Sequence, residues 1–175
     1  KDVPVTFGDF SLDHMKKELE EIKEMQKKLR EINIRELTEE QKLTYQILDE
    51  FLTTELSAEG LELYSQPLTT TIGIQTQLPV LLAEYPFYSK QDADTYLALL
   101  STIDTYYSQL IEFEKLKAEA GLFMSDASAD HVVQSCEGYL IQPDHSFLYE
   151  TFNTRIDGLE GLTQEEKDAY KAQNL

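Results

Sequence analysis

The sequence contains one cysteine, Cys136, among 175 residues. A lone cysteine excludes a disulfide within the chain and a zinc site built from several cysteines. Apolar runs are also short: none reaches the about 18 residues of a membrane-spanning helix, so we expect no membrane span. One cysteine does not fix the compartment. Because many exported proteins lack disulfides, we favour an extracytoplasmic or cell-surface lipoprotein location over the cytoplasm.

Positive charge is scarce. The chain has 15 Lys and Arg against 33 Asp and Glu, which gives a net charge of −18. A field of this sign repels phosphate backbones and anionic lipid, so we expect no nucleic-acid partner. A solvated acidic surface explains the excess of carboxylates, and attraction of cations or basic peptides is the alternative interpretation.

Catalytic and phosphate-binding motifs are missing. The histidines, His14, His131 and His145, belong to no H-E-x-x-H pattern, and the sequence has no G-x-S-x-G elbow, P-loop or G-x-G-x-x-G. Cys136 falls on the apolar side of an expected helix and is predicted to be a buried small hydrophobe. The sequence therefore predicts no catalytic and no metal-binding residue in this chain.

Two amphipathic helices are expected near the start, after an irregular lead-in over residues 1–10. Ser11 is a good N-cap, and apolar residues then recur every three or four positions from Leu12 to Ile32. We interpret this stripe as core-facing; a coiled-coil partner is the alternative. Thr38 and Gln41 form a capping box before a second helix that runs toward Ala58, with Gly60 to end it. The second helix is expected to turn these residues inward: Leu43, Tyr45, Ile47, Leu48, Phe51 and Leu52. The short connection over residues 33–37 predicts antiparallel packing.

An irregular insertion is expected over about residues 61–88, because Pro67, Pro79 and Pro86 each remove a backbone donor. Pro79 fits the first turn of a short helix over residues 80–84, and the β-branched residues 69–72 favour an extended piece. Gly73 indicates a tight turn or a close backbone approach.

Further helices are expected after the insertion. Ser89 and Asp92 predict one helix of about thirty residues, ending near Gly121. Asp126 or Ser128 is expected to cap the next helix, and a shorter helix follows from Phe147. Thr163 and Glu166 form a capping box for a last helix that reaches Leu175 without a stop signal, which indicates a truncated chain. The fold class is therefore all-α: a multi-helix, antiparallel, bundle-like single lobe over residues 1–175.

The order of these signals resembles a known family. A capping-box helix precedes a Pro67-x5-Gly73 loop, then Leu78-Pro79, Pro86-Phe87 and Tyr-Leu-x-Leu-Leu over residues 96–100. This order is similar to the N-terminal region of the bacterial "domain of unknown function 885" family, which consists of large helical proteins related to zinc metallopeptidases. The resemblance covers roughly residues 37–175. It implies that a His-Glu motif and a Pro-Gly-His motif, the presumed zinc constellation, lie far downstream in a protein about three times this length.

The resemblance carries no catalytic or metal role onto this chain. It implies that the loop with Gly73, Gln75 and Gln77 lines a substrate cleft, because glutamine amides can pair with an extended peptide; a loop that only supports the lobe is the alternative. Tyrosines gather in and after the insertion: Tyr85, Tyr88, Tyr96, Tyr106 and Tyr107. Such side chains suit half-wet cleft walls, and ordinary packing is the alternative.

We expect a catalytically inert N-terminal helical lobe of a zinc metallopeptidase-like protein. Its expected partners are the remaining C-terminal part of that protein and a peptide substrate, and its expected cofactor is none in this chain, with zinc in the parent. A stand-alone exported binding module of unknown ligand is the alternative from another class. A third alternative is a self-contained hydrolase, but the acidic residues would be its only candidates for catalysis.

Overall fold

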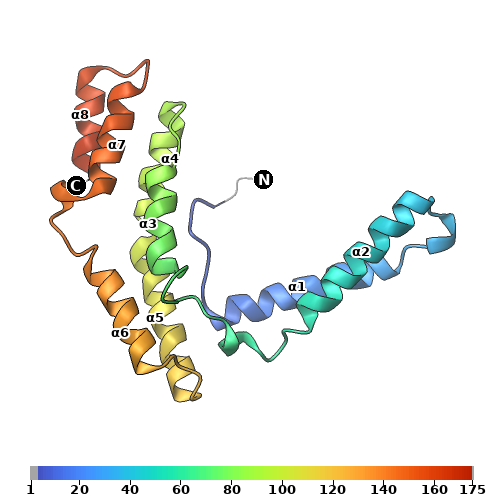
Figure 1. Ribbon diagram of the computed structural model, residues 1–175. Helices are drawn as coiled ribbons and strands as arrows, with labels where there is room; N and C mark the ends of the chain where they lie inside the picture. Colours follow the sequence, from blue (N-terminus) through green and yellow to red (C-terminus); the bar gives the residue numbers. More distant parts are fainter. Residues whose placement is uncertain (1–3, 175) are drawn as a thin grey trace. The chain divides into compact units, whose positions relative to one another are not determined.

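The computed structural model describes residues 4–174, which contain eight α-helices, three 3₁₀ helices and no strand (Figure 1). The predicted all-α class is confirmed. The elements are α1 (Leu12–Arg30), η1 (Ile34–Glu36), α2 (Glu39–Leu56), η2 (Glu62–Tyr64), α3 (Ile74–Glu84), α4 (Lys90–Leu100), α5 (Ile103–Glu119), α6 (Asp126–Glu137), η3 (Pro143–His145), α7 (Phe147–Gly158) and α8 (Gln164–Gln173). Residues 4–10 are irregular, as expected for the lead-in, and residues 1–3 and Leu175 lie outside the described residues. Within residues 4–174, no helix is long and apolar enough to cross a membrane.

The chain forms two compact units. The described part of the first unit comprises residues 4–8, 66–108 and 123–174, and the second comprises residues 9–65 and 109–122. In both units, helices begin at N-caps that the sequence predicted. Ser11 accepts a hydrogen bond from the His14 amide, and the boxes opened by Thr38 and Thr163 are complete. The cap of α6 was predicted wrongly: Ser125, one residue before Asp126, accepts from the Ser128 amide.

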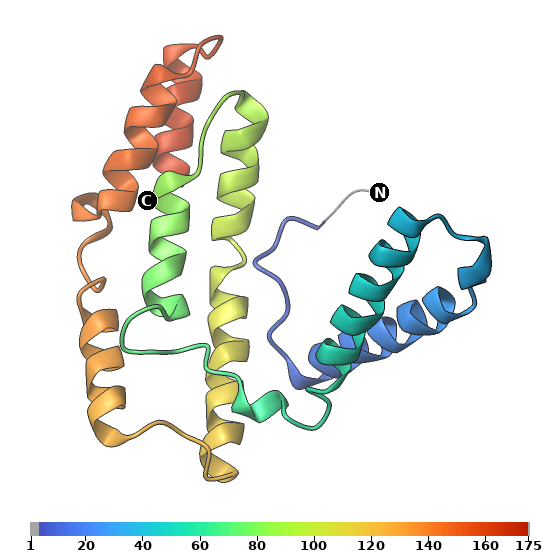
Figure 2. The same ribbon diagram turned by 45° about the vertical axis from the view of Figure 1, so that its right-hand side comes forward.

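In the second unit, α1 and α2 form an antiparallel hairpin, which confirms the predicted packing (Figures 1 and 2). Hydrogen bonds across the hairpin set its register. Arg30 Nε donates to Asp49 Oδ1 over 2.8 Å, and Gln26 Nε2 donates to Thr53 Oγ1 over 2.7 Å. Between these two pairs the residue number rises from 26 to 30 in α1 and falls from 53 to 49 in α2, so the two helices run in opposite directions.

The predicted inward face of α2 is largely wrong. Leu52 is buried and Tyr45 is half-buried, but these apolar side chains are exposed: Leu43, Ile47, Leu48 and Phe51. Met25 and Ile32 of the predicted α1 stripe are exposed as well. The reason is that α1 is the one helix with which α2 makes extensive contact in the described residues, whereas a broad apolar face needs neighbours on more than one side.

The core of the first unit joins four helices. Its buried residues are Leu78 and Leu82 of α3, Ala93 and Tyr96 of α4, Phe152 and Ile156 of α7, and Tyr170 of α8. The Tyr96 and Phe152 rings lie 5.2 Å apart, and the Tyr170 hydroxyl donates to Asp94 of α4. Burial and this carboxylate raise the pKa of Tyr170 to about 12, so the phenol stays protonated and donating at neutral pH.

The predicted thirty-residue helix is two helices. It breaks at residues 101–102, between α4 and α5. Ser101 Oγ donates to the Ala98 carbonyl over 2.7 Å, and Thr102 Oγ1 donates to the Leu99 carbonyl over 2.8 Å. Consecutive hydroxyl side chains thus compete with backbone amides for carbonyls at this point, which favours a turn over a continuous helix.

The proline-punctuated insertion contains a full helix. Residues 65–73 and 85–89 are irregular, as expected, but α3 begins at Ile74 and Pro79 lies in its interior. The predicted short helix over residues 80–84, with Pro79 in its first turn, is therefore wrong in its start. Buried Leu78 and Leu82 on α3 offset the lost backbone hydrogen bond, which costs about 3 kcal/mol in a helix interior. Residues 70–72 form a turn, so the expected extended piece is also wrong.

Candidate functional site

The start of α3 is held by a close contact between Gly73 and Gln75. Gln75 is 2% exposed, and its Nε2 donates to the Thr69 carbonyl. A Cβ on Gly73 would lie 2.0 Å from Gln75 Oε1 and 2.5 Å from the Thr69 nitrogen. The close backbone approach predicted at Gly73 is confirmed. Gln75 points into its own unit, where it fixes the preceding loop against the helix.

The opposite side of α3 is exposed. Helical spacing places Gln77, Val80, Leu81 and Glu84 on one face, which we call the α3 outer face. Val80 is 47% exposed and Leu81 is 61% exposed, and Gln77 is exposed between them and the helix start. This face offers one amide and one carboxylate beside two apolar side chains, a combination that suits a half-wet binding surface.

The two tyrosines of the predicted site have different surroundings. Tyr85 is half-buried, and its ring meets Tyr96 edge-on at 5.8 Å, so it belongs to the core packing. Tyr88 is 85% exposed, and its amide donates to Asp92 Oδ2 over 3.0 Å. Of the other tyrosines in this group, Tyr96 is buried, and Tyr106 and Tyr107 are half-buried. Of the five predicted cleft residues, the exposed side chains are therefore Gln77 and Tyr88, and their role in a cleft stays a prediction.

Groups that commonly carry catalysis are dispersed. His14 lies 3.4 Å from Glu18, while His131 and His145 are exposed. Among residues 4–174, no three His, Cys, Asp or Glu side chains lie close enough to share a metal ion. Cys136 was predicted to be buried and is exposed, although Val132, one turn earlier on the same face of α6, is buried. Partial desolvation still raises the pKa of its thiol, which disfavours the reactive thiolate.

A pair of buried charges in the second unit escaped sequence reasoning. Lys117 of α5 is fully buried, and its Nζ donates to the Ser65 carbonyl over 2.6 Å. Glu114 is 7% exposed; its carboxylate lies 3.8 Å from that nitrogen, and neither oxygen has a hydrogen-bond partner. Burial raises the pKa of Glu114, and attraction to Lys117 only partly opposes the shift. In the sequence both residues look like ordinary polar positions of an amphipathic helix, so no local signal marks them.

We expect Glu114→Gln to become more favourable relative to the parent chain as pH rises. A carboxyl whose pKa is higher in the folded than in the unfolded chain stabilises the fold in acid. That contribution is lost as pH rises from the unfolded value, 4.5, through the higher folded value. Urea unfolding of both proteins between pH 4 and pH 8 measures the difference, and Glu112→Gln is the exposed control. A difference that is constant over this range would contradict the prediction.

Comparisons with known proteins add the following. The family model described as "Bacterial protein of unknown function (DUF885)" matches residues 5–174. No curated protein matches the sequence. Among solved structures, the chain is similar to a candidate lipoprotein from Colwellia psychrerythraea, with a TM-score of 0.84 and 14% sequence identity. The likeness covers 96% of this chain and 30% of the Colwellia chain. At this identity it shows a shared fold, and this chain spans about a third of that protein's length.

Proposed function

The chain belongs to the DUF885 family of bacterial proteins, and we propose that it is a non-catalytic helical part of a larger zinc metallopeptidase-like protein, in which it lines a substrate cleft. Two findings support this proposal. The chain corresponds to 30% of the Colwellia protein, so a much larger relative has the same helical arrangement as one of its parts. The α3 outer face and Tyr88 also present apolar surface and a free amide to solvent.

The observation that carries the proposal is the division of α3 into two faces. Leu78, Leu82 and Gln75 anchor the helix in its unit, so the outer face is held on a rigid element. Rigid elements position binding side chains better than loops do. Gln77 can then pair with peptide backbone groups, and Val80 and Leu81 can cover apolar substrate side chains and exclude water.

Zinc chemistry in this proposal belongs to residues outside the chain. The family resemblance implies that the zinc-binding motifs lie downstream, and no residue of this chain matches them. A zinc ion held there would supply an activated water for attack on a peptide carbonyl. We also propose an extracytoplasmic location, which is supported by the description of the Colwellia relative as a candidate lipoprotein.

The proposal is tested by comparing this chain with a longer protein of the same family that contains it. Both are incubated with unfolded casein, with and without a chelator. We expect chelator-sensitive cleavage by the longer protein and none by the chain alone, which should also purify without stoichiometric zinc. Chelator-sensitive cleavage by the chain alone would overturn the proposal. A longer protein that does not cleave, together with a chain that binds a ligand by itself, would favour a stand-alone binding module.

Leu81→Asp tests the α3 outer face directly. In the longer protein we expect kcat/KM for casein to fall about tenfold, which corresponds to about 1.4 kcal/mol of transition-state binding. The free energy of unfolding should change by less than about 0.5 kcal/mol, because Leu81 is exposed. Leu140→Asp is the matched control, since Leu140 is 80% exposed outside α3. Equal activities of the two variants would remove the α3 outer face from the proposed cleft.

A further inference from the structure

An apolar row lies on α2. Leu43, Ile47 and Phe51 follow one another at intervals of four residues, and they are 58%, 60% and 57% exposed. Residues at this spacing lie above one another on one face of a helix. We call these three residues the α2 outer row. Each exposes more than half of a large apolar side chain, which is unusual for three successive turns of one helix.

The α2 outer row faces away from α1. Contacts to α1 come from the other side of α2, through Asp49 and Thr53, and Leu52 is buried there. At about 100° per residue, Leu52 lies about 140° around the helix from Ile47. The hairpin therefore cannot cover this row with its own residues.

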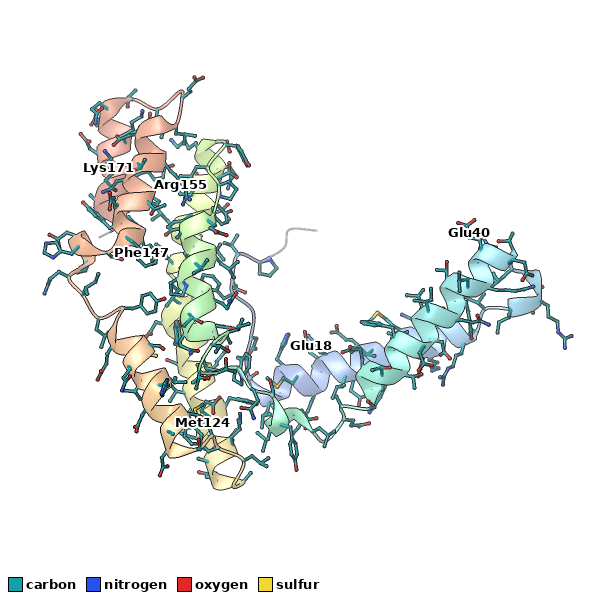
Figure 3. The ribbon with its side chains drawn as sticks, in the orientation of Figure 1. Glu18, Glu40, Met124, Phe147, Arg155 and Lys171 are labelled. Carbon is teal, nitrogen blue, oxygen red and sulfur yellow. The ribbon has the colours of Figure 1, made fainter. Side chains whose placement is uncertain are left out.

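Carboxylates lie beside the row and at its end. Glu50, three residues after Ile47, lies beside the row, and Glu55, four residues after Phe51, lies at its end; both are exposed. Glu39 and Glu40 are exposed at the start of the same helix, and Figure 3 shows Glu40 at that end of the hairpin. The lysine of this helix, Lys42, lies on the side toward α1 and pairs with Glu39 over 2.7 Å. The surface around the row is thus apolar in the middle and acidic at its edges.

This charge pattern selects among occupants. An anionic lipid surface would be repelled by the flanking glutamates. A second copy of the chain would bring its own Glu50 and Glu55 against the same residues, and like charges across an interface disfavour binding. A helix that carries lysine or arginine beside its apolar residues would instead be attracted.

We propose that the α2 outer row binds an amphipathic helix of the remaining part of the larger protein, with apolar residues four apart and Lys or Arg beside them. The inference rests on the proposed function only in placing this chain within a larger protein. Leu52 is the one apolar side chain of α1 and α2 that is buried, so covering the row adds apolar burial to this unit. Because the row follows the i±4n direction, the two helices are expected to cross at about −50°.

The first experiment measures the chemistry of the row with a peptide probe. The probe is a synthetic helix of about 18 residues with leucines four apart and lysines beside them; the matched control peptide has glutamates in place of the lysines. We expect fluorescence anisotropy to show at least about tenfold tighter binding of the lysine peptide to this chain. The double variant Glu50→Lys, Glu55→Lys should reverse the preference, and Ile47→Ser should abolish binding. Equal binding of both peptides, or none, would overturn the proposal.

The second experiment asks whether the larger protein covers the row. Ile47→Cys is introduced with Cys136→Ser, which removes the exposed native thiol. We expect a maleimide to label Cys at this position at least about tenfold more slowly in the longer protein than in this chain alone. Equal labelling would overturn the proposal. Slow labelling of the chain alone would also overturn it, with concentration dependence indicating a second copy. Because this readout does not use peptidase activity, protection without casein cleavage would reject the proposed function and keep this inference.

Discussion

Lys117→Met is expected to lower the free energy of unfolding by about 3–5 kcal/mol, the cost typical of removing one partner from a buried ion pair. Lys117 is fully buried and makes two interactions through one nitrogen. It donates to the Ser65 carbonyl over 2.6 Å and lies 3.8 Å from the Glu114 carboxylate. Methionine keeps much of the side-chain volume, so the loss reports on charge and hydrogen bonding rather than on a cavity.

The loss of stability in Lys117→Met is large because the substitution leaves two polar groups without their partner. Without Lys117, Glu114 is a buried carboxylate whose oxygens have no hydrogen-bond partner and whose nearest cation is gone. The Ser65 carbonyl also loses its donor, and an unsatisfied buried polar group costs about 1–3 kcal/mol. Adding Glu114→Gln to the variant removes the stranded charge, so the double variant is expected to recover part of the loss.

Urea unfolding followed by circular dichroism measures this prediction. Lys115→Met is the matched control, because Lys115 lies two residues away, is 63% exposed and pairs with Glu112 at the surface over 2.6 Å. Exposed ion pairs contribute about 0–1 kcal/mol, so the control should unfold close to the parent chain. If Lys117→Met unfolds within about 1 kcal/mol of the control, the buried pair does not stabilise the second unit as described.

The parts of the fold that the sequence predicted are those set by local physics. N-caps at Ser11, Thr38 and Thr163 depend on side chains three residues away at most, and they were found correctly. The α1–α2 pairing followed from a short connection. The close approach at Gly73 followed from the absence of a side chain, although the residues that it meets were not predictable.

The parts that failed depend on neighbours distant in the sequence. Apolar periodicity identified α2 as a helix, but it could not tell whether a second element covers Leu43, Ile47 and Phe51. The helix through Pro79 forms because Leu78 and Leu82 find a core made by α4, α7 and α8, which local propensity does not include. Lys117 is buried because the chain at Ser65 returns to cover it, 52 residues away.

The exposure of the candidate site residues could not be predicted fully, for the same reason. Sequence reasoning selected this segment, but it could not tell which side of α3 faces solvent. It therefore grouped Gln75, which is buried, with Gln77, which is exposed. Val80 and Leu81 were not chosen, because apolar residues in a helix are ordinarily assigned to the core. Their position on the face opposite Leu78 and Leu82 could have been read from helical periodicity once α3 was known to start at Ile74.

Gly73→Ala is expected to lower the free energy of unfolding by about 2–5 kcal/mol, the sum of overpacking and of a lost buried hydrogen bond. The backbone at Gly73 has a φ of −88°, which alanine adopts freely, so the cost is steric. The new methyl carbon would meet Gln75 Oε1 at 2.0 Å and the Thr69 nitrogen at 2.5 Å. Gln75 is buried and cannot swing away without losing its bond to the Thr69 carbonyl.

A second substitution separates the two contacts. Gln75→Ala in the Gly73→Ala background removes the side-chain clash but leaves the clash with the Thr69 backbone, so the double variant should remain destabilised. Gly158→Ala is the matched control: Gly158 lies at the end of α7, and the added carbon would point into open space. Alanine in a helix is favoured over glycine by about 0.5–1 kcal/mol, so this control should unfold at the same or higher urea concentration. Thermal and urea unfolding of the parent chain, Gly73→Ala, the double variant and Gly158→Ala measure this prediction. A Gly73→Ala chain as stable as the Gly158→Ala control would show that the loop before α3 rearranges without a free-energy cost. In that case α3 would not be fixed at its start, and the rigid presentation of Gln77, Val80 and Leu81 would lose its structural basis.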